Sequence, residues 1–205
     1  ARFSHDSGTS FGEEVMISNP DLGACACCSM AAEYMNDDDI LVAYRSAING
    51  IGRDMQLLTV TGVSGELSGA SYGAMHESQK WEASFCPLST NDIALDSNNN
   101  RWLVFETKGR IQQLNLSNSS DPSQVGPPFI ETRQKNPAIA FNKYNERLVV
   151  WGEAINHARG GRLNLRVFND TGADTGYAEA EEIQIDNYSF PAAVGLPNGD
   201  FLVLY

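Results

Sequence analysis

The stretch Ser4–Phe11, "SHDSGTSF", is a turn dense in serine, aspartate and glycine that comes just before the strand-like run "EEVMIS" at 13–18. The carboxylate of Asp6 can accept backbone N–H groups across such a turn, and Gly8 can take the positive φ that the turn requires. We expect the ring of Phe11 to pack beneath the turn. The segment is therefore interpreted as a folding device that joins two strands.

Four short apolar runs, rich in β-branched and aromatic residues, recur along the chain, each after a turn of Asn, Asp or Gly. They are "ILVAY" at 40–44, "RWLVF" at 101–105, "RLVVW" at 147–151 and "FLVLY" at 201–205. Each run has a partner just before its turn, and the partners are "SMAAEY", "NDIALD", "NPAIAF" and "FPAAVGL". The pattern predicts four β-hairpins.

The hairpins form an internal repeat. Ile40 aligns with Arg147 at an offset of 107 residues (147 − 40), and the tripeptide "AIN" follows at the same offset, at Ala47 and at Ala154. Because the offset holds through both hairpin and loop, we expect Ala47 and Ala154 to lie at corresponding places in their units.

The spacing of the units indicates a β-propeller. Arg101, Arg147 and Asp200 mark successive units 46 and 53 residues apart (147 − 101 and 200 − 147), and repeats of about 50 residues with several strands each are typical of propeller blades. Third strands are expected in "DMQLLTV", "GRIQQLNLS" and "GRLNLRVFN". Equivalent second-strand positions are expected for Tyr44, Phe105, Trp151 and Leu204.

The predicted fold class is all-β, a propeller of four-stranded antiparallel blades with almost no helix. We expect one propeller domain, or part of one, across 1–205, with half-blades at 1–18 and 190–205 and blades at about 28–85, 86–131 and 137–187. Since both ends fall inside strands, we expect a window from a ring of about six to eight blades. A closed four-bladed ring is the alternative.

Composition excludes two classes of partner. Acidic residues outnumber basic ones by 26 to 14, and the net charge of −12 would repel nucleic acid and anionic membrane surfaces. No apolar run approaches the roughly 20 residues that span a bilayer, and "ARFSHDSG" lacks the features of a secretory signal. We expect no nucleic-acid partner and no membrane span, and any export signal to have been removed.

The opening turn has the form Ser-x-Asp-x-Gly-x-x-aromatic, with Ser4, Asp6, Gly8 and Phe11 in those places. It resembles the Asp box of sialidase-like propellers (the bacterial neuraminidase, or BNR, repeat), which lies between the third and fourth strands of a blade. "TVTGVSGEL" and "FNDTGADTG" are less regular candidates for the same turn. The resemblance implies that ligands bind on the opposite face, formed by the blade-to-blade and second-to-third-strand connections.

A Cys-x-Cys-Cys motif begins a more specific pattern, which continues with Tyr-Arg, Arg-Asp, a Trp and Cys-Pro. The residues are Cys25, Cys27, Cys28, Tyr44, Arg45, Arg53, Asp54, Trp81, Cys86 and Pro87. The pattern resembles an exported bacterial group of sialidase-like propellers, which implies an extracellular or periplasmic location. The sequence "PLSTND" after Cys86 departs from the glycine-containing loop of that group.

Loops of the presumed ligand face carry candidate binding residues, namely Arg45, Arg53, Asp54, His76, Trp81, Arg133 and His157. Sialidase chemistry needs an arginine cluster for the substrate carboxylate, a Tyr nucleophile activated by Glu, and an Asp acid. Arg159 and Glu77 lie in these loops too, but no Tyr–Glu pair is evident in them. The alternative is structural, with Arg45 and Arg53 serving as partners of Asp and of backbone carbonyls.

The opposite ends of the strands carry the acidic or amide turns "NDDD", "DSNNN", "NKYNE" and "PNGD". Because such turns recur at every hairpin, they are interpreted as solvated turns rather than as a calcium site. No metal site is assigned to them, and the catalytic residues, if any, are unknown.

The cysteines support two interpretations, disulfides in an exported protein or copper(I) ligation by Cys25–Cys28 with Met30 or Met75 nearby. We expect disulfides and no cofactor. Cys86 should pair with one of Cys25, Cys27 or Cys28, of which Cys27 and Cys28 stand closer to the start of their strand, as Cys86 does.

Taken together, the sequence predicts a secreted or periplasmic sialidase-like propeller that acts as a binding or assembly module for a protein partner or a glycan. One alternative is a glycoside hydrolase of sialidase type whose remaining catalytic residues lie outside this chain. The other is a surface copper(I)-binding protein.

Overall fold

The structure is a computed structural model. It describes residues 1–65, 69–74, 79–119, 121–126, 132–154, 161–175, 183–186 and 189–205. The chain divides into two compact units, the first formed by Ala1–Cys25 and Ala31–Ser84, the second by Ala26–Met30 and Phe85–Tyr205.

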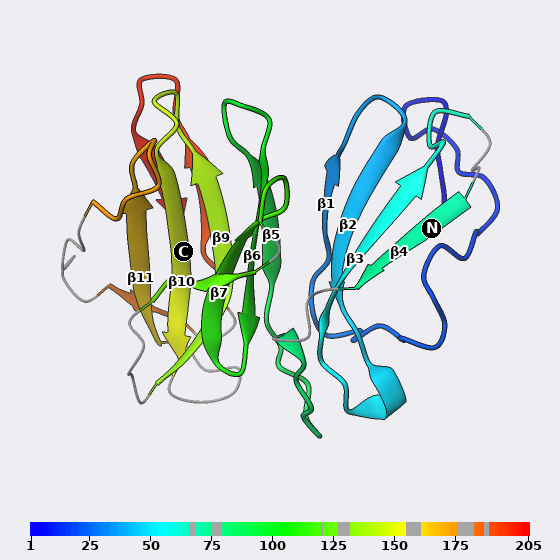
Figure 1. Cartoon of the computed structure of the whole chain (residues 1–205), viewed down its shortest axis with the longest axis horizontal. Helices are drawn as coiled ribbons and strands as arrows, with labels where there is room; N and C mark the ends of the chain where they lie inside the picture. Colours follow the sequence, from blue (N-terminus) through cyan, green and yellow to red (C-terminus); the bar gives the residue numbers. More distant parts are fainter. Residues whose placement is uncertain are drawn as a thin grey trace. The chain divides into compact units, whose positions relative to one another are not determined.

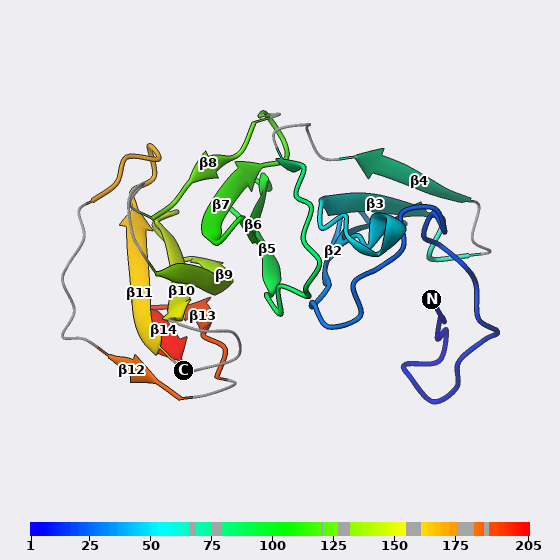
Figure 2. The ribbon, with the colours of Figure 1, turned by 90° about the horizontal axis from the view of Figure 1, so that it is seen from below.

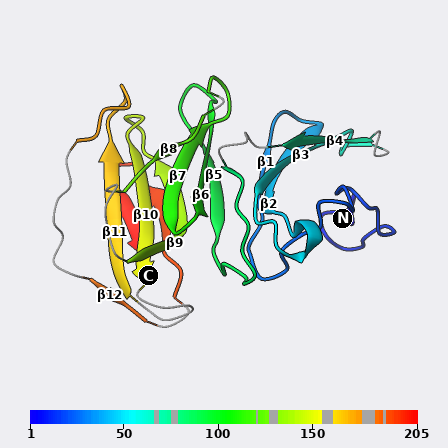
Figure 3. The same cartoon turned by 60° about the horizontal axis from the view of Figure 1, so that its bottom comes forward.

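The first unit contains one antiparallel four-stranded sheet in chain order (Figure 3). Its strands are β1 (Ala31–Tyr34), β2 (Asp39–Arg45), β3 (Met55–Thr61) and β4 (Gly69–Ala74), and a short 3-10 turn at Ile48–Gly50 joins β2 to β3. Phe3 and Ile17 of the N-terminal segment pack against a core of Tyr44, Leu58 and Val60. The N-terminal segment is therefore held to this sheet by apolar burial.

The second unit contains two further four-stranded sheets and a hairpin (Figure 1). One sheet holds β5 (Asn91–Leu95), β6 (Arg101–Thr107), β7 (Arg110–Asn115) and β8 (Ser123–Gln124). The other holds β9 (Arg133–Phe141), β10 (Arg147–Ala154), β11 (Gly161–Phe168) and β12 (Gln184–Ile185), and the hairpin is β13 (Ala192–Gly195) with β14 (Phe201–Leu204). All pairings are antiparallel between chain neighbours.

The first strands of successive sheets lie side by side in the second unit. β9 lies between β5 and β13 and contacts both (Figure 2). The backbone N–H of Ile139 donates to Asp92 Oδ2 at 3.0 Å, and Asn142 Nδ2 donates to the carbonyl of Gly199 at 2.6 Å. Four-stranded meanders whose first strands adjoin are blades of a propeller, so the predicted all-β propeller class is confirmed.

The hairpin repeat is visible as four turns closed by the same hydrogen bond. The backbone N–H donates to the carbonyl four residues later in Met35–Asp39 (2.8 Å), Asp96–Asn100 (3.0 Å), Asn142–Glu146 (3.1 Å) and Leu196–Asp200 (2.8 Å). Third strands lie where they were expected, in β3, β7 and β11. Ala47 and Ala154 both lie at the exit of a second strand, as the repeat predicted.

Counting from these turns corrects one predicted position. Tyr44, Phe105 and Trp151 each stand five residues after the residue that closes the turn (44 − 39 for the first), and all three are buried. Leu204 stands only four residues after Asp200, so its equivalence was wrong and Tyr205 is the corresponding residue. The error arose because Asp200 closes its turn, whereas Arg101 and Arg147 each follow the closing residue.

The N-terminal segment differs from the predicted half-blade at 1–18. No strand is assigned to residues 1–30, although Gly12 N donates to Phe3 O at 2.9 Å and Val15 N to Ala1 O at 2.8 Å. These bonds pair the two arms of the loop with each other. Phe11 is 61% exposed, so the expected packing of its ring beneath the turn is absent. The two arms of the loop pair with each other, and in the described part of this unit no sheet face lies beneath the turn to cover the ring.

Membrane insertion through a helix finds no support in the structure. Among the residues that the structure describes, no helix is long and apolar enough to cross a bilayer.

Candidate functional site

The Ser4–Phe11 turn is built around the carboxylate of Asp6. Asp6 Oδ1 accepts from the backbone N–H of Ser10 (2.9 Å) and from Ser4 Oγ (2.8 Å), and Asp6 Oδ2 accepts from Ser10 Oγ (2.6 Å). Gly8 has φ +83° and donates its N–H to Ser4 Oγ at 2.8 Å. Every one of these bonds stays inside the turn, which is the geometry of a folding device.

These hydrogen bonds predict an unusually acidic side chain at Asp6. Those from Ser10, followed by that from Ser4, lower the pKa of Asp6 from 3.8 to about 2. Since the folded-state pKa lies below the unfolded one, the stabilisation is present above about pH 4 and is lost as the pH falls through about 2. NMR titration of the Asp6 carboxyl should give a midpoint near 2, and Ser10→Ala should move it toward 3.8.

A control residue makes this pKa prediction specific. The pKa of Asp96, in another turn, is also lowered by hydrogen bonds of its own, and its midpoint should not respond to Ser10→Ala. An Asp6 midpoint that stays in place in Ser10→Ala would contradict the assignment of the shift to Ser10.

A related turn occurs in "FNDTGADTG", with an amide in place of the carboxylate. Asn169 Oδ1 accepts from the backbone N–H of Thr171 (3.1 Å) and of Ala173 (2.8 Å). In "TVTGVSGEL", residues 66 and 67 lie outside the described residues. Asx-centred turns are therefore a recurring way of closing strand connections in this chain.

Four of the predicted ligand residues come together within the first unit, where they bond mainly to backbone. Arg45 Nη1 donates to the carbonyl of Arg53 at 2.7 Å, and the Arg45 guanidinium lies 5.3 Å from the Trp81 ring centre. Asp54 Oδ1 accepts a hydrogen bond from the backbone N–H of Trp81 at 2.8 Å. Arg53 donates to the carbonyls of Gly52 (3.1 Å) and Gly50 (2.7 Å).

The low exposure of the two arginine side chains fits a structural role. Arg45 is 2% exposed and Arg53 is 7% exposed. The N–H groups of a buried guanidinium need hydrogen-bond acceptors nearby, and here the acceptors are backbone carbonyls of the β2–β3 connection. The contacts match the structural alternative for Arg45 and Arg53, and their role as ligand-binding residues stays a prediction.

Three predicted ligand residues remain, and the structure describes one of them, Arg133. Arg133, in the second unit, forms an ion pair with the fully buried Glu106 at 2.9 Å and lies 5.0 Å from the Phe85 ring centre. His76 and His157 lie outside the described residues, as do Met75, Glu77 and Arg159.

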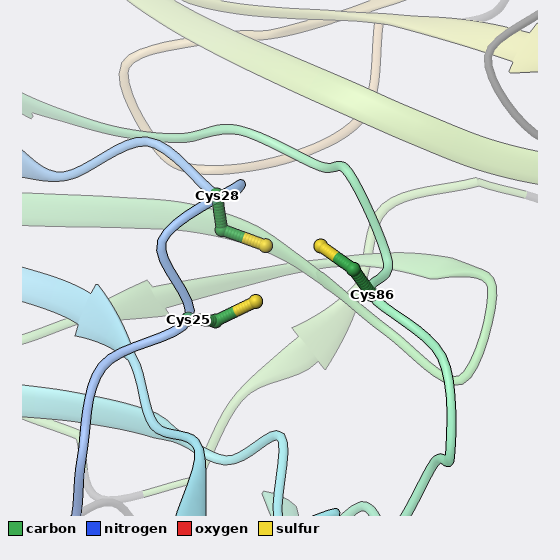
Figure 4. Close-up of side chains that lie close together, drawn as sticks. All are labelled: Cys25, Cys28 and Cys86. Carbon is green, nitrogen blue, oxygen red and sulfur yellow. The ribbon is translucent and has the colours of Figure 1, made fainter. Parts of the chain in front are cut away.

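All four cysteines are thiols in this structure. The Sγ atoms of Cys28 and Cys86, both in the second unit, lie within 4.8 Å of each other, and Figure 4 shows these two side chains pointing toward each other. Cys27 is exposed and stands outside this group. The expected approach of Cys86 to the motif is therefore present through Cys28, while the disulfide itself stays a prediction.

The second unit also contains a cavity of about 480 Å³ at the turn ends of its two four-stranded sheets. Its walls come from the turns around Asp96–Asn100 and Asn169–Gly172, and from Asn145. Trp102, Phe141 and Arg147 also line it. These residues combine aromatic surface with amide and carboxylate groups, and one cation.

Arg147 is the most unusual residue of this cavity. Its guanidinium lies 3.8 Å from the ring centre of Trp102 and 4.4 Å from that of Phe168, in cation–π contact with both. Arg147 is 4% exposed, and its buried Nε has no hydrogen-bond partner among the described residues. Burial lowers the pKa of Arg147 to about 10, against the opposing effect of the Asp96 carboxylate, so the side chain remains a cation at neutral pH.

Asp96 holds the aromatic wall of the cavity. Its Oδ1 accepts from the backbone N–H groups of Asn98 (2.8 Å) and Asn100 (2.9 Å), and its Oδ2 accepts from the Asn100 side chain (2.9 Å) and from Trp102 Nε1 (3.4 Å). Burial works to raise the pKa of Asp96, but these hydrogen bonds, chiefly from Asn100, outweigh it and lower the pKa. The Trp102 ring is thus tied to a turn whose Asp96 carboxylate is ionised at neutral pH.

Sequence reasoning missed this cavity because it interpreted "DSNNN" and "NKYNE" as solvated turns. Asp96 is only 9% exposed and Asn142 only 7%, so part of each turn is buried. A signal was present in Trp102 and Arg147, polar-tipped residues near the starts of otherwise apolar second strands. Their meeting across two blades could not be predicted from spacing alone.

No family model and no curated protein matches the chain. Among solved structures, the chain is similar to an exo-1,5-α-L-arabinanase from a bovine ruminal metagenomic library, with 13% identity and a TM-score of 0.47 over 90% of this chain and 72% of that chain. The sialidase-like assignment accordingly rests on the motifs of the sequence.

Proposed function

We propose that this propeller is a binding module for a neutral glycan, which it holds in the cavity of the second unit. The observation that carries the proposal is Arg147, a buried cation that is stacked on Trp102 and lines a cavity rich in amides. Export to the cell surface or periplasm, expected from the motif resemblance, belongs to the same proposal.

The cavity offers the groups that recognise sugars. An aromatic ring such as Trp102 presents a flat apolar surface for the C–H face of a sugar ring, while Asn98, Asn145 and Asn169 present amides for hydroxyl groups. The guanidinium of Arg147 adds a planar set of donors that suits adjacent oxygen atoms.

The charge of the cavity favours a neutral ligand over an acidic one. Among the described residues, the lining includes three carboxylates, Asp96, Asp121 and Asp170, against one guanidinium, that of Arg147. A carboxylated sugar would meet net repulsion in this setting. The proposal therefore differs from the sialidase alternative, whose substrate carries a carboxylate.

Replacement of Arg147 should weaken glycan binding strongly. A panel of neutral and carboxylated oligosaccharides is screened for a ligand, and its affinity is measured by calorimetry. We expect Arg147→Gln to weaken binding of the neutral ligand at least tenfold, because the cavity loses its cation and its stacked donors. Arg101→Gln is the matched control, since Arg101 starts β6 as Arg147 starts β10 but does not line the cavity.

A second variant guards against a folding defect in Arg147→Gln. Asn98 is exposed and lines the cavity, so Asn98→Ala should weaken binding with an unchanged melting temperature. Binding by the carboxylated sugars alone, or equal binding by the Arg147 and Arg101 variants, would overturn the proposal. Release of new reducing ends from a bound glycan would replace it with the glycoside hydrolase alternative.

A further inference from the structure

Two thiols of the second unit form a candidate site of their own, apart from the cavity. We propose that Cys28 and Cys86 are joined as a disulfide by exchange with a low-molecular-weight disulfide such as oxidised glutathione, and that the buried side chain of Lys135 promotes the reaction. All three residues belong to the second unit. The inference is independent of the glycan proposal, because none of the three lines the cavity.

The two sulfur atoms lie close enough to be brought together by side-chain movement. Cys28 Sγ and Cys86 Sγ lie within 4.8 Å of each other, and their side chains point toward each other (Figure 4). A disulfide places its sulfur atoms about 2.05 Å apart and its Cβ atoms about 3.5–4.5 Å apart. Rotation about the Cα–Cβ bonds of the two facing cysteines is the movement that closes the remaining distance.

Hydrogen bonds hold the two cysteine segments together. Ser29, next to Cys28, accepts from Asn91 twice, at Oγ from the backbone N–H (3.2 Å) and at its carbonyl from Nδ2 (2.7 Å). Cys86 lies five residues before Asn91 in the segment that enters β5 (91 − 86). Folding of the second unit therefore brings the two thiols together before any bond forms between them, so the cost of closing the loop is already met.

The segment that enters β5 is also bonded to the start of β9, where Lys135 lies. The backbone N–H of Thr90 donates to Asn136 Oδ1 at 3.2 Å, and the backbone N–H of Asn136 donates to Ser89 Oγ at 3.2 Å. Lys135 precedes Asn136 in β9 and is only 3% exposed. A buried amine is thus held beside the segment that carries Cys86.

The charge of Lys135 is coupled to the charges of the two sulfurs. Burial lowers the pKa of Lys135 most, and the charge of Arg133 lowers it further. Negative charges raise the pKa of Lys135, first that of Glu106 and then those of Cys28 and Cys86. Because this interaction is mutual, the ammonium of Lys135 stabilises the two thiolates, and the thiolate is the attacking form in disulfide exchange.

The exchange proceeds in two steps that transfer two electrons to the small disulfide. One cysteine thiolate attacks a sulfur of oxidised glutathione, which forms a mixed disulfide and releases one glutathione thiolate. The second cysteine thiolate attacks the protein sulfur of the mixed disulfide, which forms the Cys28–Cys86 bond and releases the second glutathione thiolate. The two released thiolates take up two protons, the same number that the two cysteine thiols gave up.

The bond closes a long loop of the chain. Cys28 and Cys86 are 58 residues apart (86 − 28), and the strands β1 to β4 lie between them in sequence. A cross-link that closes a loop of this length restricts the unfolded chain and so stabilises the folded one. We expect the melting temperature to rise by at least about 5 °C on oxidation.

The test uses the whole chain, first reduced and then equilibrated anaerobically with a mixture of oxidised and reduced glutathione. Remaining thiols are trapped with an alkylating reagent, and linked peptides are mapped by mass spectrometry. We expect one Cys28–Cys86 bond per chain, together with the rise in melting temperature. Cys27→Ser is the matched control, since Cys27 is exposed, and it should keep the bond and the rise. Cys28→Ser should lose both.

Replacement of Lys135 tests the role of its charge. Lys135→Met should slow formation of the bond at least about threefold at pH 7. The rate at pH 10 should stay unchanged, because both thiols are largely ionised there without help from a cation. A rate reduced equally at both pH values would overturn the part assigned to Lys135. Cys86 linked to Cys25 or Cys27, mixed disulfides with glutathione alone, or an unchanged melting temperature in the oxidised, unaltered protein would overturn the disulfide.

Discussion

Trp151→Ala should lower the free energy of unfolding of the second unit by about 3–5 kcal/mol. Trp151 is fully buried at the centre of a core that also contains Val104, Ile139 and Phe168. Removal of the indole leaves a cavity that strands paired on both sides cannot close, so the lost transfer energy and the cavity cost add together. Chemical denaturation followed by circular dichroism measures the change.

Trp151→Phe is the control for this prediction. The indole Nε1 of Trp151 is buried and has no hydrogen-bond partner among the described residues, so phenylalanine removes an unsatisfied donor and keeps most of the apolar volume. We expect a loss of about 1 kcal/mol or less, as for a modest reduction of core volume. A cost for Trp151→Phe as large as that for Trp151→Ala would contradict this account of the core.

Gly195→Ala should detach the β13–β14 hairpin from the neighbouring blade. A Cβ atom at Gly195 would lie 2.1 Å from the carbonyl oxygen of Phe141 and 2.9 Å from the Cα of Asn142. Both are backbone atoms, which cannot rotate away as a side chain could. We expect a cost of about 1–3 kcal/mol or more, together with faster hydrogen exchange at the amides of β13 and β14.

The expected damage is local because the hairpin has its own contact surface. Phe201 and Val203 of β14 pack against the core of Ala138, Leu148 and Val150. Gly12→Ala is the control, since a Cβ there would meet only Phe3 O at 3.7 Å. Unchanged exchange in β13 and β14 of Gly195→Ala would show that the close approach to Phe141 is absent in solution.

The hairpins were predictable because their signals are local. Each turn sequence is followed by a run of β-branched and aromatic residues, and the backbone bond that closes each turn spans only five residues. Propensity and turn chemistry act within that range. The mistaken position of Leu204 shows the limit, because an alignment that is off by one residue assigns every later residue to the other face of the strand.

The candidate sites were less predictable because their parts come from distant segments. Arg147 meets Trp102 across 45 residues of sequence (147 − 102), and Cys86 meets Cys28 across 58 (86 − 28). The motif pointed to the cysteines, but it left open whether Cys27 or Cys28 faces Cys86. Nothing in the turns "DSNNN" and "NKYNE" distinguished a cavity wall from an ordinary solvated loop.

By itself, the sequence determined the all-β class, the repeat and the second and third strands of the blades, because strand periodicity and turn chemistry are properties of neighbouring residues. Only the tertiary structure decided that Arg45 and Arg53 bond backbone carbonyls, that Arg147 lies buried on an aromatic ring, and that Cys28 rather than Cys27 approaches Cys86. Those outcomes depend on which side chains packing brings together and removes from water, and no local pattern encodes that choice.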